Sequence, residues 1–251
     1  MDQPKLKIAL IFEGKKIDRW QSEMVSIIAN SYYAEIKWLI RLNSNQSKTK
    51  RNYPTYKKCF WHQLFLKLDQ KIFNIKPNAF DTTKFNSIKF QKEIEISSTE
   101  NSLNKESKKN LNKLIDKKID IILDLSETKP ELNLPNLSKY GIWHLTFSDY
   151  TPKNQNLSGL LEVLHKKDYI NSRLIVSFEN QNKTLFSSKS FVDISSIHKS
   201  RNSVFWKTSL FIPRQLENLY NNRQRFVDKI NNHETTSPLK ITENYPSLFS
   251  L

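Results

Sequence analysis

The heptapeptide IDIILDL, Ile119 to Leu125, has the composition of a buried β-strand. Apart from two aspartates it contains only isoleucine and leucine, without the regular polar alternation of a strand that has one solvated face. Such a run is typical of a strand covered on both faces, as in a parallel sheet. A strand of this kind requires further strands beside it and helices above and below it.

The segments around this strand supply those elements. Lys7 to Phe12 (KIALIF) is a short apolar run, Asp18 can cap a helix behind it, and Ala34 to Leu42 alternates large apolar with polar residues. The opening is therefore strand, helix, strand. Further patterns predict helices at 56–73, 101–118 and 159–166, strands at 87–96, 141–147, 173–178 and 185–191, and one or two helices at 195–231.

This alternation predicts an α/β fold with a mainly parallel sheet and helices on both faces. The 251 residues fit one large domain, which we place at 1–231, followed by a polar tail at 232–251 with two prolines. A hydrophobic share of 37% is enough for a sizeable core. The chain has only three glycines, which excludes the glycine-rich phosphate loops of P-loop and dinucleotide-binding proteins.

The formal net charge of +15 favours binding to a polyanion such as nucleic acid. The lysines and arginines, however, form short groups along the whole chain and not one patch interleaved with aromatic residues. A solvated basic surface is the simpler interpretation, and nucleic-acid binding stays open as an alternative.

The single cysteine, Cys59, excludes an internal disulfide and a thiolate-rich zinc site, and the five histidines lack the spacing of a metal site. The N-terminal apolar run, Ile8 to Phe12, is too short for a signal peptide, and no later run approaches the length of a membrane span. We therefore expect a soluble, cytoplasmic protein without a metal or a membrane partner. The sequence leaves its oligomeric state open.

Candidate site residues follow two of the strands, because ligands of open parallel sheets bind beyond the carboxyl ends of the strands. Ser126 and Glu127 come directly after IDIILDL and are candidates for ligand binding. Inside that strand, Asp124 is either a hydrogen-bonded structural residue or a functional acid, because an ionised carboxylate is costly to bury without a partner.

The second group lies in GIWHLTFSDY, Gly141 to Tyr150. His144 and Thr146 share one face of this strand, since residues two apart in a strand point the same way. His144 can be a general base, or a histidine satisfied by hydrogen bonds. Asp149 can be its acid partner, or a capping or turn residue.

Four segments, in this order, resemble bacterial formyltransferase-like domains, which are distant relatives of methionyl-tRNA formyltransferase and of the sugar N-formyltransferases. The resemblance covers roughly residues 5–217 and implies a Rossmann-like sheet of the type found in the N-terminal domain of formyltransferases. The segments are LFLKLDQKIFNIKPNAF (Leu64 to Phe80), IDIILDL, YGIWHLTFSD (Tyr140 to Asp149) with GLLEVL (Gly159 to Leu164), and RNSVFWKTSLFIPRQL (Arg201 to Leu216).

The resemblance implies attack by an amine on the formyl group of 10-formyltetrahydrofolate. In the family, an Asn, a His two residues later and a later Asp polarise the formyl group and handle the proton. On this sequence the Asn position falls at His144, the His position at Thr146, and the Asp position near Glu179 to Asn182, which includes Asn180. None of the three positions keeps the family residue, and a threonine cannot exchange protons near neutral pH.

The sequence thus predicts a formyltransferase-fold protein with a degenerate catalytic centre that acts as a binding or accessory module for a small-molecule or glycan-type substrate such as an amino sugar. The first alternative is an altered formyl or acyl transferase that uses His144 with Asp149 or Glu179. The second is the nucleic-acid-binding protein suggested by charge. The basic residues of RNSVFWK, 201–207, serve either packing around Phe205 and Trp206 or an anionic ligand.

Overall fold

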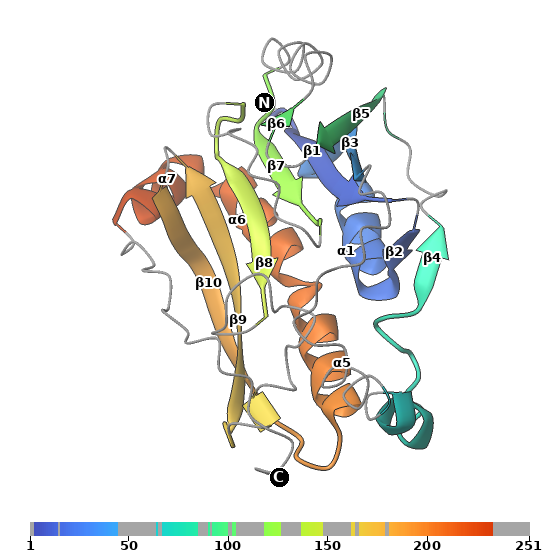
Figure 1. Ribbon diagram of the computed structural model, residues 1–251. Coiled ribbons are helices and arrows are strands. Elements are labelled where there is room, and N and C mark those ends of the chain that lie inside the picture. The colour runs from blue at the N-terminus through green and yellow to red at the C-terminus, as the bar shows by residue number, and fades with distance from the viewer. Residues whose placement is uncertain are drawn as a thin grey trace.

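The computed structural model of the chain has one large β-sheet with helices packed against it (Figure 1). It describes residues 3–14, 16–44, 64, 67–84, 90, 92–99, 102–103, 118–126, 137–147, 162–163, 166–178 and 181–232. The sheet has eight strands in the order β10-β9-β8-β7-β1-β3-β5-β6. Their bounds are β1 (Leu6–Glu13), β3 (Ala34–Ser44), β5 (Lys92–Thr99), β6 (Ser102–Leu103), β7 (Ile121–Asp124), β8 (Ile142–Thr146), β9 (Tyr169–Phe178) and β10 (Gln181–Phe191).

The middle of the sheet is parallel. β1 pairs in parallel with β3 and with β7, β3 pairs in parallel with β5, and β7 pairs in parallel with β8. The order of the strands reverses between β1 and β7, and open α/β sheets bind their ligands at such a switch point, beyond the carboxyl ends of the strands. The predicted α/β, Rossmann-like, mainly parallel sheet is confirmed.

The described helices share one hydrophobic cluster with one face of the sheet. Successive residues of β1 alternate between the two faces: Ile8 and Leu10 belong to this cluster, whereas Ala9 and Ile11 belong to a second cluster on the opposite face. Both faces of β1 are therefore buried. The helices are α1 (Arg19–Ala29), which is capped by Asp18 as predicted, and α5 (Ile197–Thr208), α6 (Phe211–Asn221) and α7 (Arg223–Asn232).

The last two strands differ from the sequence-based expectation. β9 starts at Tyr169 and β10 at Gln181, and both extend earlier in the chain than predicted. They form an antiparallel hairpin, and β9 also pairs antiparallel with β8. The buried and less buried residues of β9 alternate regularly, so its first residues lack the continuous apolar run that marks β1 and β7. A small sheet of β2 (Lys16–Asp18) and β4 (Thr82–Lys84) was also missed, because strands of three residues carry no pattern.

Gly141 lets β8 lie close to β9 at the start of their pairing. Its φ is +78°, a backbone conformation that side chains disfavour, and a Cβ at this position would lie 2.6 Å from the carbonyl oxygen of Ser177. Gly14, which follows β1, has a similar φ of +75° but open space around it.

Of the predicted helix at 56–73 the structure describes residues 64 and 67–73, and of these 64 and 67–72 are helical. Two apolar residues of this turn, Leu68 and Ile72, are 48% and 72% exposed, and the residue that it buries is Asp69. Asp69 is buried because its carboxylate accepts a hydrogen bond from the first turn of α5.

The described C-terminal region has three helices, where one or two were predicted. One break falls before Pro213, which occupies the first turn of α6 and needs no N–H there. The predicted helix at 101–118 lies mostly outside the described residues, and its described start, residues 102–103, is strand β6 and not helix. The predicted helix at 159–166 is described only at 162–163, which are helical, and at 166, and the predicted tail only at Asn232, the last residue of α7.

Candidate functional site

His144 and Thr146 lie on the face of β8 that turns away from the described helices. Their neighbours Trp143, Leu145 and Phe147 belong to the cluster that packs against those helices. Successive side chains of a strand alternate, so His144 and Thr146 point to the opposite side. Both residues are near the carboxyl end of β8, two strands from β1.

His144 lies beside Asp124 across the parallel pairing of β7 and β8. The two residues are register partners, and neighbouring strands lie about 4.8 Å apart, so their side chains leave the same face next to each other. His144 is only 7% exposed. A carboxylate next to a buried imidazole can orient the ring by accepting a hydrogen bond from it.

The carboxylate of Asp124 is itself held in place by Ser126. Its Oδ1 accepts hydrogen bonds from the backbone N–H of Ser126, at 3.0 Å, and from the Ser126 hydroxyl, at 2.5 Å. Ser126, which we predicted to bind a ligand, therefore uses its hydroxyl to position Asp124. The sequence left open whether Asp124 is a structural residue or a functional acid, and the strand register gives its position beside His144.

Thr146 occupies the position where the resemblance placed a histidine. It is the register partner of Arg173 on β9, and its Oγ1 is enclosed without a hydrogen-bonding partner among the described residues. An unsatisfied buried hydroxyl costs about 1–3 kcal/mol, and a polar atom of a ligand would satisfy it. The hydroxyl can donate or accept a hydrogen bond, but it cannot act as a base near neutral pH.

The remaining candidates, Glu127, Asp149, Glu179 and Asn180, lie outside the described residues. Their roles therefore stay predictions.

On the opposite face of the same edge, the end of β8 leads into an aromatic cluster. Phe147 stacks on Phe205 of α5 with 3.9 Å between the ring centroids. Trp20 of α1 meets both of these rings edge-on, at 5.4 Å from each. This cluster joins the start of α1, the end of β8 and the middle of α5.

Arg201 covers one side of the aromatic cluster. Its guanidinium carbon lies 4.6 Å from the centroid of Phe80 and 5.9 Å from that of Phe205. Its Nε is enclosed and has no hydrogen-bonding partner in the described part of the chain. Burial lowers the pKa of Arg201, and the carboxylate of Asp18 opposes that effect.

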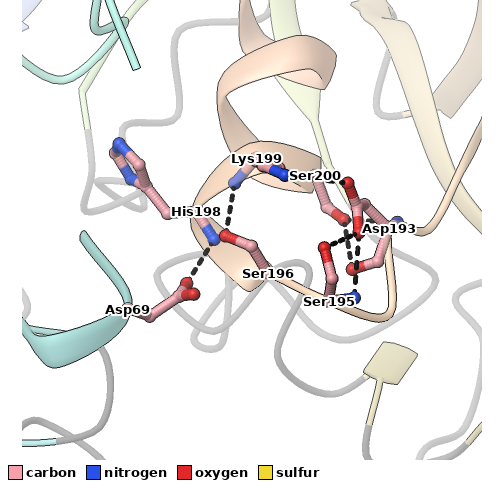
Figure 2. Close-up of polar contacts among 7 residues, drawn as sticks. All are labelled: Asp69, Asp193, Ser195, Ser196, His198, Lys199 and Ser200. Atoms are coloured by element: carbon pink, nitrogen blue, oxygen red, sulfur yellow. Dashed lines mark hydrogen bonds and ion pairs between the residues drawn. The ribbon is translucent and has the colours of Figure 1, made fainter. Parts of the chain in front are cut away.

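The first turn of α5 is fixed by side chains from two segments (Figure 2). Ser196 caps the helix by accepting a hydrogen bond from the backbone N–H of Lys199, at 3.1 Å. Asp69 accepts one from the backbone N–H of His198, at 2.6 Å. The imidazole of His198 points away from these contacts in Figure 2, so the ring takes no part in the cap.

A basic surface cavity of about 430 Å³ lies between the helical turn at 67–72 and the segment that follows it. Its lining includes Lys67, Lys71 and Lys76 together with Asp81. None of the residues that we predicted for the site is among the described residues that line this cavity.

Within the described part of the chain, no three His, Cys, Asp or Glu side chains gather so that they could hold a metal ion. In the same part, no helix is long and apolar enough to cross a membrane.

Comparison with known proteins gives a match at the level of the fold. No protein-family model matches the chain, and no curated protein matches it by sequence. Among solved structures, the phosphoribosylglycinamide formyltransferase of Coxiella burnetii matches with a TM-score of 0.52 and 13% identity over 85% of this chain and 86% of that one. Glycinamide ribonucleotide transformylase 1 of Symbiobacterium toebii matches with a TM-score of 0.51 and 7% identity over 87% and 89%.

A third structure, the phosphoribosylglycinamide formyltransferase of Bacillus halodurans, matches with a TM-score of 0.50 and 10% identity over 86% of this chain and 96% of that one. At these identities the likeness shows the fold alone. The chain therefore has the fold of the formyltransferases, as the four sequence segments predicted.

Proposed function

We propose that this protein binds a folate-type one-carbon donor, 10-formyltetrahydrofolate or a close derivative, at the carboxyl edge of β7 and β8. In this proposal it acts as a binding or accessory module and transfers the formyl group poorly. An amine-bearing small molecule such as an amino sugar would occupy the acceptor position. The observation that supports the proposal is the buried hydroxyl of Thr146, which no described residue satisfies, beside His144 at the ligand-binding edge of a formyltransferase fold.

The chemistry of formyl transfer explains why a threonine at position 146 is compatible with ligand binding but not with efficient catalysis. In formyl transfer, the amine nitrogen attacks the formyl carbon, loses a proton, and expels the folate nitrogen, which gains one. Thr146 could donate a hydrogen bond to the formyl oxygen, but it could not take the proton of the attacking amine. Loss of a general base typically costs about 10²- to 10⁴-fold in rate.

One observation favours a second candidate, an altered transferase. Asp124 is the register neighbour of His144 and is held by two hydrogen bonds from Ser126. His144 would then take the proton of the amine while Asp124 orients the ring. The partners predicted from the sequence, Asp149 and Glu179, lie outside the described residues.

The proposal is tested by calorimetric titration with 5-formyltetrahydrofolate, a stable analogue of the donor. We expect saturable binding to the wild type and weaker binding to Thr146→Val, which removes the hydroxyl and keeps the shape. Because none of the described residues bonds to Thr146 Oγ1, this variant should lose no stability.

Thr82→Val is the matched control, since Thr82 is exposed on β4. It should bind the analogue like the wild type. A wild-type protein that gives no binding heat, or equal affinities for all three proteins, would contradict the proposed site.

A further inference from the structure

Arg201 is held in place by aromatic rings, although a charged side chain of its kind usually pairs with a carboxylate. The faces of Phe80 and Phe205 contact its guanidinium, and its Nε is enclosed. No hydrogen bond or ion pair to its guanidinium is found within the described residues. An arginine stacked on a ring keeps the edge of its guanidinium available for bonds in its own plane.

The segment that carries Phe80 is anchored firmly to α5. The Oδ1 atom of Asn202 accepts a hydrogen bond from the N–H of Ala79 at 2.7 Å, and the Trp206 indole N–H donates to the carbonyl of Pro77 at 3.0 Å. These contacts position the ring that supports Arg201, and this fixes the direction of the guanidinium.

His198 lies one helical turn before Arg201, so both side chains leave the same side of α5. The Phe80 ring is 6.5 Å from the imidazole, centroid to centroid. Figure 2 shows the imidazole turned away from the capping side chains, and none of the described residues forms a hydrogen bond with it. The same side of α5 thus carries two nitrogen-bearing groups that no described residue engages in a hydrogen bond.

The start of α1, where a helix N-terminus could hold an anion, is already occupied. The N–H of Arg19 donates to the carbonyl of Asp81 at 2.8 Å, and the N–H of Trp20 donates to the carbonyl of Ala79 at 3.2 Å. Asp18 and Gln21 complete the cap. The donors of this helix start are therefore engaged, and Arg201 on α5 is the better placed group for an anion.

We propose that Arg201, assisted by His198, anchors a carboxylate or phosphate group of a ligand on the helix-covered face of the sheet, opposite His144. The planar fork of the guanidinium matches two oxygens of either group, and the ring nitrogens of His198 can supply a further contact. The carboxylates of Asp18, which acts on Arg201, and of Asp69 and Asp81, which act on His198, oppose an anion. Two of them are also engaged in helix caps, Asp18 at α1 and Asp69 at α5. This site is independent of the folate proposal, because it uses different residues on the opposite face.

The test uses inorganic phosphate and succinate as probes, each titrated calorimetrically into the full chain. We expect one saturable site for at least one probe, and the tighter probe identifies the class of the anionic group. Arg201→Met should weaken binding about tenfold or more, because it removes a charge-assisted hydrogen-bonding group. Arg214→Met, which removes an exposed arginine of α6, should bind like the wild type.

A second measurement keeps the test independent of the folding of Arg201→Met. In the wild type, the Nε–H resonance of Arg201 should shift during the titration, with the same midpoint as the binding heat. The absence of saturable binding to both probes, an equal loss in the two arginine variants, or an Arg201 resonance that does not move would each overturn the proposal.

Discussion

At the carboxyl edge of the sheet, the face that carries His144 and the face that carries Phe147 are built from different interactions. On the first, Asp124, His144 and Thr146 stand on adjacent strands, and the Thr146 hydroxyl is one that no described residue satisfies. On the second, Arg201 packs against the rings of Phe80 and Phe205, and Phe205 stacks on Phe147. The His144 face presents polar side chains on the strands themselves, and the Phe147 face presents the guanidinium of Arg201 packed against aromatic rings.

This difference indicates how each face can be changed. The polar groups of the His144 face are set by strand register, so single side chains there can be altered with little loss of packing. The Arg201 face depends on aromatic rings that pack against one another, so substitutions there should lower the stability of the protein as well as any binding.

Phe205→Ala should cause the largest loss. Phe205 is 7% exposed and contacts the rings of Trp20, Phe80 and Phe147, so its removal leaves a cavity that should cost about 3–5 kcal/mol of unfolding free energy. Urea unfolding followed by circular dichroism measures this. Phe191→Ala, at a residue that is 77% exposed, should cost far less, and equal losses would refute the role of the ring cluster.

Gly141→Ala should disturb both faces together, because Gly141 sets the approach of β8 to β9. The added Cβ meets the carbonyl oxygen of Ser177 and imposes a side chain at positive φ, and together these should cost about 2–5 kcal/mol. Gly14→Ala carries only the φ penalty of about 1–2 kcal/mol, since no described atom lies near its Cβ. Thermal unfolding of the two variants compares them; a Gly14 variant as unstable as the Gly141 variant would argue against the clash.

Asn202→Ala should loosen the segment that supports Arg201. It leaves the buried N–H of Ala79 without its partner, at a cost of about 1–3 kcal/mol of unfolding free energy. Asn218→Ala, on the exposed side of α6, is the control and should change stability little. If Asn202→Ala were as stable as the control, the anchoring role of Asn202 would be wrong.

His198 should make stability depend on pH in a defined direction. Burial lowers the pKa of His198; the carboxylate of Asp69 opposes this, Arg201 adds to it, and Asp81 opposes it. The unfolded chain, with a histidine pKa of about 6.5, therefore binds a proton more readily than the folded protein. Stability should fall as the pH drops below about 6.5, until the lowered pKa has been passed.

His198→Asn provides the comparison for that pH dependence. Its unfolding free energy, measured in urea between neutral and mildly acidic pH, should fall less steeply than that of the wild type. Parallel curves for the two proteins would show that His198 does not titrate differently on folding.

Periodicity and composition predicted the central elements because each has a local sequence signal. β1 and β7 are continuous apolar runs, and α1 follows the capping residue Asp18. The hairpin of β9 and β10 was predicted less well, since its pairing with β8 is a tertiary property. Short strands such as β2 leave no pattern to read.

For the candidate site, too, the sequence did not reveal the contacts that depend on tertiary structure. The position and face of His144 and Thr146 followed from strand alternation, but the neighbour Asp124 required the register of β7 against β8. Arg201 appeared in the sequence only as one of the two basic residues of RNSVFWK. Its setting depends on Phe80, which is far away in sequence and is brought to α5 by Asn202.

The most direct test of the central proposal is the rate at which formyl groups leave 10-formyltetrahydrofolate in the presence of the protein. The assay is run with and without added amino sugars, for the wild type and for His144→Ala. If the His144 face binds without efficient chemistry, both proteins should release formyl groups at the same slow rate, close to that in buffer, while still binding the folate analogue. A wild-type rate that His144→Ala reduces by about 10²-fold or more would contradict the account and establish His144 as a catalytic residue.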